Sequence, residues 1–159
     1  MKHTLILVVY FICISLSNSL KAQTEMFSCP FTNGTMLVRD AKKPLFGCFP
    51  DLSVNVVSKE TEVLAASDGI VSAIARIGDL NYLIVQTKEY YVTCGPLDSC
   101  FVAKNDTIKR DQKIGINNNG KIEVLVNKGL NSIENPERLF NCPCMTEDDY
   151  ARAHPQLNN

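Results

Sequence analysis

Cysteine and histidine are the residues of this sequence best suited to metal binding or covalent chemistry, and their numbers differ sharply. The chain has seven cysteines and two histidines, His3 and His154. Cys13 lies in an apolar run near the N-terminus, and the other six cysteines are Cys29, Cys48, Cys94, Cys100, Cys142 and Cys144. An even number of cysteines is typical of a disulfide framework if the protein reaches an oxidising compartment.

Cysteine spacing suggests two disulfide pairs. Cys94 and Cys100 bracket the turn-rich stretch GPLDS, and we expect a disulfide to close this loop. Cys29 and Cys48 bracket a segment that contains Asn33-Gly34, which is a β-hairpin signal. The sequence alone leaves the full connectivity open.

Cys142 and Cys144 form a Cys-x-Cys pair that is too close for easy disulfide formation. Such a pair is an alternative candidate for zinc binding. Structural zinc sites usually separate neighbouring cysteines by two to four residues, so a one-residue spacer disfavours this alternative.

The N-terminus has the features of a secretory signal peptide. Lys2 and His3 precede the apolar run from Leu5 to Leu16, and a small residue, Ala22, offers a cleavage point. We therefore predict a signal peptide over residues 1–22 and export to the periplasm or the extracellular space. A retained membrane anchor is the alternative, but the run is short for a transmembrane helix, so we expect no membrane span after cleavage.

Charge excludes one class of partner. The formal net charge is -1, with apolar residues at 45% and charged residues at 21%. A nearly neutral chain offers no basic surface for phosphate groups, so we expect no nucleic-acid partner.

Short runs of branched and aromatic residues predict an all-β fold. Turn residues separate these runs at intervals of about ten residues, which is typical of an antiparallel β-sandwich or barrel. The runs are 35–40, 52–58, 62–67, 70–77, 81–87, 89–94, 99–104 and 121–127.

Helical signals are confined to the C-terminal part. Asn135-Pro136 predicts a short helical turn ending near Phe140, because proline suits the first position of a helix. Thr146 followed by acidic residues predicts a capped helix in the segment TEDDYARA. We accordingly divide the chain into the signal peptide, an N-terminal extension or hairpin (23–50), one β domain (51–140) and a tail with a short helix (141–159).

Three motifs give the predicted domain a recognisable frame. The first is Val63-x-Ala65-x-x-Asp68-Gly69-x-Val71. The second places Val102, Ile108 and Ile114 every six residues, with Asn105 and Asp111 midway between them. The third is the closing run that contains Gly129, Asn135, Pro136 and Leu139.

In order and spacing, these motifs resemble those of the LytM, or M23, family of peptidoglycan-cleaving metallopeptidases. The family has glycine where this chain has Asn105 and Asp111. Asparagine and aspartate tolerate a left-handed backbone better than other residues except glycine, so we expect that conformation at both positions. The resemblance implies an M23-like core of mainly antiparallel sheet, similar to a barrel-sandwich.

The resemblance also implies zinc, because the family holds it with H-x-x-x-D and H-x-H and assists the attacking water with Y-x-H-L. The first run falls on Pro50 and Val54, or on Asp51 and Asn55 with a one-residue gap; the second falls on Gly120, Lys121 and Ile122; the third falls on Cys94, Pro96 and Leu97. None of these is histidine, and only His154 would remain after signal cleavage. We therefore expect no zinc, no other cofactor and no catalytic residues.

Two other active-site arrangements are weaker alternatives. Asp51 and Glu123 are oxygen donors near the lost ligands, but Asp51 follows Pro50 in a turn, and Glu123 alternates with inward-facing Ile122 and Val124. A Ser-His-Asp triad would have to use His154, which lies in the tail.

The resulting hypothesis is an exported envelope protein that binds peptidoglycan or a partner such as a wall hydrolase without cleaving it. We expect the binding surface around Asp51, Asn55, Pro96 and Lys121, where Lys121 can meet wall-peptide carboxylates. One alternative is an active zinc metalloendopeptidase with atypical ligands. Another is a biotin- or lipoyl-carrier module, which would need an exposed lysine in a tight hairpin.

Overall fold

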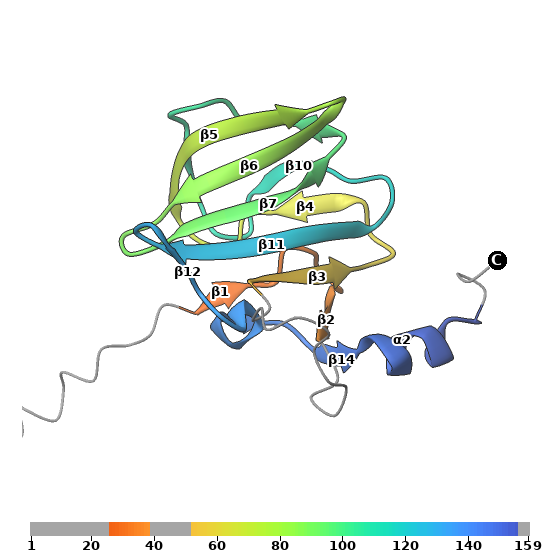
Figure 1. Ribbon diagram of the computed structural model, residues 1–159. Helices are drawn as coiled ribbons and strands as arrows, with labels where there is room; N and C mark the ends of the chain where they lie inside the picture. Colours follow the sequence, from red (N-terminus) through yellow and green to blue (C-terminus); the bar gives the residue numbers. More distant parts are fainter. Residues whose placement is uncertain (1–25, 39–51, 156–159) are drawn as a thin grey trace, which may run out of the picture.

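Two β-sheets packed face to face make up most of the described chain, residues 26–38 and 52–155 of the computed structural model (Figure 1). Within this part, the larger sheet has nine strands, in the order β14-β2-β3-β11-β7-β6-β5-β9 with β12 beside β11. Its strands are β2 (Thr35–Val38), β3 (Ser53–Val57), β5 (Gly69–Ile77), β6 (Leu80–Gln86), β7 (Tyr91–Leu97), β9 (Thr107–Ile108), β11 (Lys121–Lys128), β12 (Asn131–Ser132) and β14 (Cys144–Thr146).

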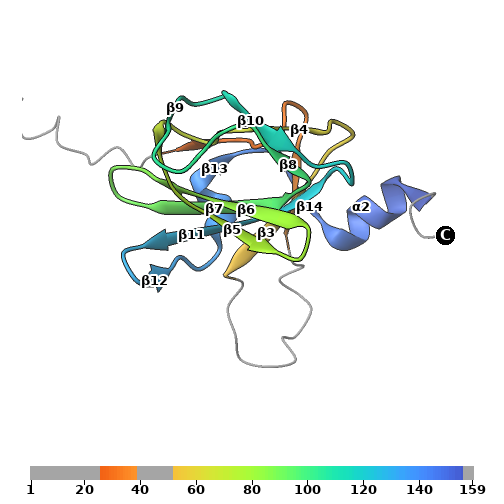
Figure 2. The same ribbon diagram turned by 90° about the horizontal axis from the view of Figure 1, so that it is seen from above.

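A smaller sheet covers one face of the larger one (Figure 2). It contains β4 (Glu62–Leu64), β10 (Lys113–Ile116) and β8 (Ser99–Cys100), with β10 in the middle. A separate parallel pair joins β1 (Phe27–Ser28) to β13 (Phe140–Asn141). The predicted all-β, mainly antiparallel class is confirmed.

The core lies between the two sheets because the strands of the larger sheet alternate. In β11, Ile122, Val124 and Val126 are fully buried, whereas Lys121 and Glu123 are exposed. Side chains on alternate faces of a strand produce this pattern, and it confirms the outward position predicted for Glu123. Apolar residues of β4 and β10, among them Val63 and Ile114, close the core from the other side.

The two residues that replace glycine adopt the predicted left-handed backbone. Asn105 has φ 75° and Asp111 has φ 63°. These residues donate their backbone N–H groups to the carbonyls of Val71 and Ala65, each at 2.8 Å. The loop from Asn105 to Asp111 is thereby hydrogen-bonded along the first motif, which has the same six-residue spacing.

Asp68 connects the same two motifs through its side chain. Its carboxylate accepts hydrogen bonds from the backbone N–H of Arg110 at 2.8 Å and from Lys109 Nζ at 3.3 Å. The Arg110 hydrogen bond, followed by the Lys109 contact, holds the pKa of Asp68 below its ordinary value. The neighbouring Gly69 leaves space for the Gln86 carbonyl, which would lie 2.6 Å from an added Cβ. Asp68 therefore links the first motif to the second, and Gly69 allows β5 to lie close to β6.

The segments on either side of the motif-bearing region join the sheets. β2 pairs with β3, and β14 extends the same sheet on the other side of β2. Asn33 and Gly34 do form a turn, in which the Gly34 N–H donates to Phe31 O at 3.2 Å. The strands that flank this turn do not pair with each other, because β1 pairs with β13 and β2 pairs with β3; residues 39–50 of the predicted extension or hairpin lie outside the described residues.

The disulfide pairs suggested by loop spacing also differ from the structure. Cys29 is bonded to Cys142, 113 residues away, with a Cα–Cα distance of 5.0 Å. Cys94 and Cys100 are free thiols, as is the exposed Cys144, and Cys48 lies outside the described residues. The expected Cys94–Cys100 bridge is therefore wrong. Backbone hydrogen bonds to β10 hold this loop instead, from Asp98 N to Ile116 O and from Phe101 N to Ile114 O.

Both predicted C-terminal helical elements are present. Pro136–Leu139 forms the 3-10 helix η1, and Glu147–Ala153 forms α2. The Thr146 side chain caps α2 by accepting a hydrogen bond from the Asp149 N–H at 3.1 Å. No helix in the described ranges is long and apolar enough to cross a membrane.

The Cys29–Cys142 bond should contribute strongly to stability because it closes a loop of more than one hundred residues. We expect the Cys29→Ser/Cys142→Ser variant to lose about 2–5 kcal/mol of unfolding free energy. Urea unfolding with and without a reductant provides the measurement. The reductant should destabilise the wild type to a similar extent and leave the variant nearly unchanged. A non-reduced peptide map joining Cys29 to another cysteine would contradict the pairing.

Candidate functional site

The face of the larger sheet that points away from the smaller sheet carries the region where the zinc-ligand motifs align. We call it the outer face and define it by Ser53 and Asn55 of β3, Thr93 of β7, and Lys121 and Glu123 of β11. Strand register places Asn55 and Gly95 on either side of Glu123. Ser53 Oγ donates a hydrogen bond to the Glu123 carboxylate.

The predicted site residues are brought together only in part. Asn55 and Lys121 lie on adjacent strands, with Lys121 opposite Val57 and Asn55 opposite Glu123. Pro96 follows Gly95 at the neighbouring end of β7, and Asp51 lies outside the described residues. The grouping around Asn55, Pro96 and Lys121 stays a prediction about binding.

The side-chain directions in β11 show that the residues on the outer face differ from those that align with the H-x-H pair. Sequence alignment puts that pair on Gly120 and Ile122, but Ile122 is fully buried in the core and Gly120 lies in the preceding turn. The outward residues one position further along are Lys121 and Glu123. Two neighbouring outward positions therefore supply one ammonium group and one carboxylate.

The donors on the outer face do not fit a zinc ion. Zinc in peptidases is held by three protein donors of nitrogen, sulfur or carboxylate type. Glu123 supplies one carboxylate, and Asn55 and Ser53 add an amide and a hydroxyl, which are poor zinc ligands. Within residues 26–38 and 52–155, no group of three or more His, Cys, Asp or Glu side chains is placed to hold a metal.

A buried asparagine that sequence analysis missed organises the end of the outer face. The side chain of Asn117 donates to Pro96 O at 2.8 Å and accepts from the Lys121 N–H at 3.0 Å. Its backbone N–H donates to Thr61 O at 2.8 Å. Asn117 is only 1% exposed, so each of these bonds is shielded from water. The sequence INNNG indicates a turn there, but no signal in it distinguishes the buried asparagine from its neighbours.

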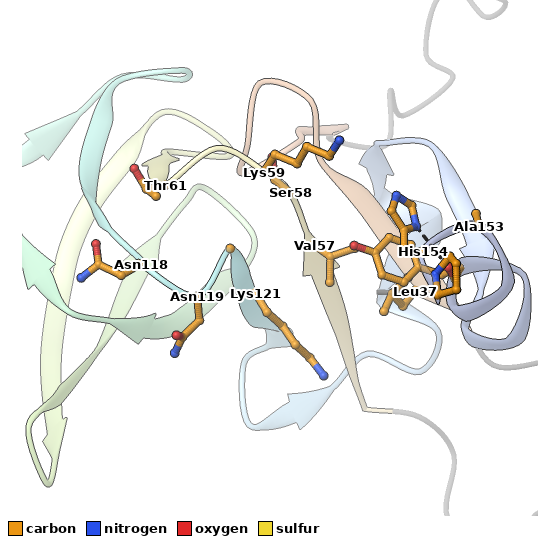
Figure 3. Close-up of a pocket in the computed structure, with 13 residues that line it drawn as sticks. Leu37, Val57, Ser58, Lys59, Thr61, Asn118, Asn119, Lys121, Ala153 and His154 are labelled. Carbon is orange, nitrogen blue, oxygen red and sulfur yellow. Dashed lines mark hydrogen bonds between the residues drawn. The ribbon is translucent and has the colours of Figure 1, made fainter. Parts of the chain in front are cut away.

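A groove lies next to this turn, between the strands and α2 (Figure 3). It has a volume of about 840 Å³. Its walls come from β2, the end of β3 and the following loop, the β10–β11 turn, and α2 with the residues after it. The lining residues are Leu37, Val57, Ser58, Lys59, Thr61, Asn118, Asn119, Gly120, Lys121, Tyr150, Ala153, His154 and Pro155.

His154, the histidine of the predicted mature chain, stands at the α2 end of this groove. Its ring stacks on Tyr150 with a centroid distance of 4.3 Å. Nδ1 lies 3.1 Å from the Tyr150 carbonyl oxygen. A carbonyl can only accept a hydrogen bond, so this contact is a hydrogen bond in the tautomer that carries its proton on Nδ1.

The cysteine at the start of the Y-x-H-L alignment belongs to the core. Cys94 is 6% exposed and points between the sheets. Burial, with a smaller effect from nearby Cys100, raises the pKa of the Cys94 thiol to about 12. A thiol with such a pKa stays protonated at neutral pH, so Cys94 is unsuited to act as a nucleophile.

Comparisons with known proteins identify the fold. No protein-family model matches the sequence, and no curated protein matches it. Solved structures do match. The catalytic domain of the prophage-encoded M23 protein EnpA from Enterococcus faecalis has a TM-score of 0.52 at 16% identity, covering 65% of this chain and 88% of that domain.

Two further structures agree. A chain of the SpoIIQ–SpoIIIAH pore forming complex has a TM-score of 0.57 at 14% identity, covering 82% of this chain and 99% of that one. The M23 metalloprotease Pseudoalterin, from the deep sea, has a TM-score of 0.54 at 11% identity, covering 72% and 78%. The chain therefore has the fold of M23 peptidase domains, as its motifs indicated.

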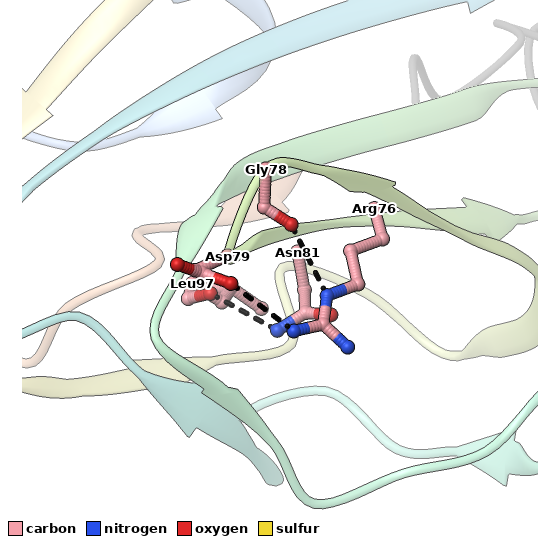
Figure 4. A network of polar contacts seen from close by, with 5 residues as sticks. All are labelled: Arg76, Gly78, Asp79, Asn81 and Leu97. Carbon is pink, nitrogen blue, oxygen red and sulfur yellow. Dashed lines mark hydrogen bonds and ion pairs between the residues drawn. The ribbon is translucent and has the colours of Figure 1, made fainter.

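Gly120, the glycine among the residues that line the groove, should tolerate substitution poorly. Its φ is 59°, and an added Cβ would lie 2.2 Å from Ser58 O. Gly78, in the β5–β6 turn held by Arg76 and Asp79 (Figure 4), also has a positive φ, 63°, but nothing within 4 Å of an added Cβ. We expect Gly78→Ala to cost about 1–2 kcal/mol.

Gly120→Ala should cost a further 1–3 kcal/mol or so because the Ser58 backbone must also move. Chemical unfolding of both variants provides the measurement, and Gly78→Ala serves as the matched control for left-handed strain alone. Equal losses of unfolding free energy in the two variants would show that the Ser58 backbone can move at no measurable cost.

The buried Cys94 thiol should make stability fall in alkali. The unfolded chain loses this proton near pH 9, whereas the folded chain holds it up to a pKa of about 12. The contribution is therefore complete below about pH 9 and is lost towards pH 12, at up to about 1.4 kcal/mol per pH unit. Urea unfolding between about pH 8 and 11 should show a weaker fall in Cys94→Ala than in wild type. The control, Cys144→Ala, removes an exposed thiol, and a wild-type slope in Cys94→Ala would refute this assignment.

Proposed function

We propose that this chain is an exported protein of the cell envelope that uses an M23-like fold to bind peptidoglycan without cleaving it. The observation that carries the proposal is the donor set on the outer face. Among the described residues of the outer face, Glu123 is the one carboxylate, whereas zinc in peptidases is held by three protein donors. That carboxylate is already hydrogen-bonded to Ser53.

Export is supported by two independent features. The first residues have the charge and apolar pattern of a signal peptide. The Cys29–Cys142 disulfide is the kind of bond that persists in oxidising compartments outside the cytosol. Together they favour the periplasm or the extracellular space as the place of action.

The outer face offers groups suited to holding a peptide-bearing polymer. Asn55 can donate to and accept from peptide amides, and the Lys121 ammonium can pair with a carboxylate. Thr93 and the Gly95 backbone lie across β11 from Asn55, on the strand beyond it. Neither a general base nor a metal is needed for such contacts, so they support binding without requiring hydrolysis.

A partner protein, such as a wall hydrolase, is the second candidate ligand. One observation favours it: a chain of similar fold belongs to a two-protein assembly, the SpoIIQ–SpoIIIAH complex. A protein partner would use the same outer face, since its polar groups are compatible with either ligand.

The proposal predicts binding without turnover. Purified mature protein should carry less than about one-tenth of an equivalent of zinc, leave purified peptidoglycan undigested, and co-sediment with it. Elemental analysis, a turbidity assay and sedimentation provide the measurements, with an active M23 peptidase as positive control. Stoichiometric zinc with chelator-sensitive digestion would establish the metalloendopeptidase alternative instead. Failure to co-sediment, together with capture of a wall hydrolase from envelope extract, would favour the partner protein.

A further inference from the structure

The groove beside α2 combines unpaired positive charge with walls that are held in place. It lies outside the motif-bearing frame on its helix side, because α2 begins at Glu147. A volume of about 840 Å³ falls within the range of sites that enclose a small molecule or a short peptide.

Two lysines give the groove its charge. In Figure 3 the Lys59 side chain extends towards the side where His154 stands, and the Lys121 side chain extends from the start of β11 in a different direction. Among the described residues, neither lysine forms an ion pair. No aspartate or glutamate of the described chain lines the groove. The nearest carboxylate on the same face of β11, Glu123, is engaged by Ser53.

Backbone hydrogen bonds fix the strand side of the groove. Ser58 N–H donates to Gly120 O at 2.8 Å, which ties the β3–β4 loop to the β10–β11 turn. Asn118 N–H donates to the Asp98 carboxylate at 2.6 Å, and buried Asn117 anchors the start of the turn. The two segments that carry Lys59 and Lys121 are therefore held at a fixed separation, which reduces the ordering cost of binding.

The helix side adds directional and apolar contacts. The stacked rings of Tyr150 and His154 line the groove from the helix side, and the Tyr150 carbonyl lies 3.1 Å from His154 Nδ1. Leu37 and Val57 contribute apolar side chains between the two sides. A ligand that suits this lining has carboxylates to meet the ammonium groups and a backbone or aliphatic part to cover the apolar residues.

We propose that the groove between α2 and the β10–β11 turn binds a short carboxylate-bearing peptide, with Lys59 and Lys121 as its charge partners. This proposal rests on the proposed binding function and deepens it by naming the ligand chemistry. The motifs alone predict a binding surface on the outer face of the sheet, and the groove adds Lys59, the residues of α2 and His154 to it.

The test titrates the full mature protein with tetraglutamate carrying a free C-terminal carboxylate, followed by calorimetry at low ionic strength. N-acetylated tetraglutamine amide, of the same length but uncharged, serves as the ligand control. We expect saturable binding of tetraglutamate, at least about tenfold weaker binding of tetraglutamine amide, and marked weakening of the former at about 0.15 M salt.

Variants assign the binding to the groove. Lys59→Gln/Lys121→Gln should weaken tetraglutamate binding by about tenfold or more. The matched control, Lys88→Gln/Lys104→Gln, removes two exposed lysines that do not line the groove and should bind as wild type. Ala153→Trp fills the groove from α2 without changing charge and should also weaken binding. Thermal unfolding checks that each variant is folded.

Equal losses in both lysine pairs, or no effect of Ala153→Trp in a folded protein, would overturn the groove proposal. Co-sedimentation of the same variants with peptidoglycan separates it from the proposed function. Tetraglutamate binding that depends on the groove residues, without peptidoglycan binding, would support the groove proposal and contradict the proposed peptidoglycan-binding function. If the groove variants bind peptidoglycan as wild type does and tetraglutamate does not bind, the peptidoglycan-binding function would be supported and the groove proposal would be contradicted.

Discussion

The fold depends on a pair of backbone hydrogen bonds between two motifs that lie far apart in the sequence. Asn105 and Asp111 adopt a left-handed backbone, and only in that conformation do their N–H groups point at the carbonyls of Val71 and Ala65. The equal six-residue spacing on both sides keeps the two bonds in register. Asp68 adds a side-chain link to the same loop, and the core residues Ile108 and Ile114 are thereby positioned between the sheets.

This constraint explains how chains with different side chains on the outer face can share one fold. The hydrogen bonds that close the frame use backbone groups and a few buried side chains, none of which lies on the outer face. Residues on that face, such as Lys121 and Glu123, are exposed and leave the core unchanged when they vary. Different side chains on the outer face are therefore compatible with an M23-like fold at low sequence identity.

Local features were predictable from the sequence, and long-range ones were not. The strands, the Thr146 cap and the left-handed Asn105 and Asp111 follow from residue type and near neighbours. The Cys29–Cys142 bond, the buried position of Asn117 and the α2 groove depend on segments brought together by folding. Cys94 and Cys100 were misassigned because spacing suggested a closed loop, whereas strand alternation turns Cys94 into the core.

Residues 27–38 pair with residues 140–146, and this pairing limits when the fold can be completed during synthesis. β1 pairs with β13, β2 pairs with β14 on its outer side, and Cys29 forms its disulfide with Cys142. A nascent chain on the ribosome lacks all three partners until residues 140–146 have been made. The native architecture is thus completed only after residues 140–146 have been synthesised, and a chain truncated before them would retain an unpartnered β1 and a free Cys29 thiol.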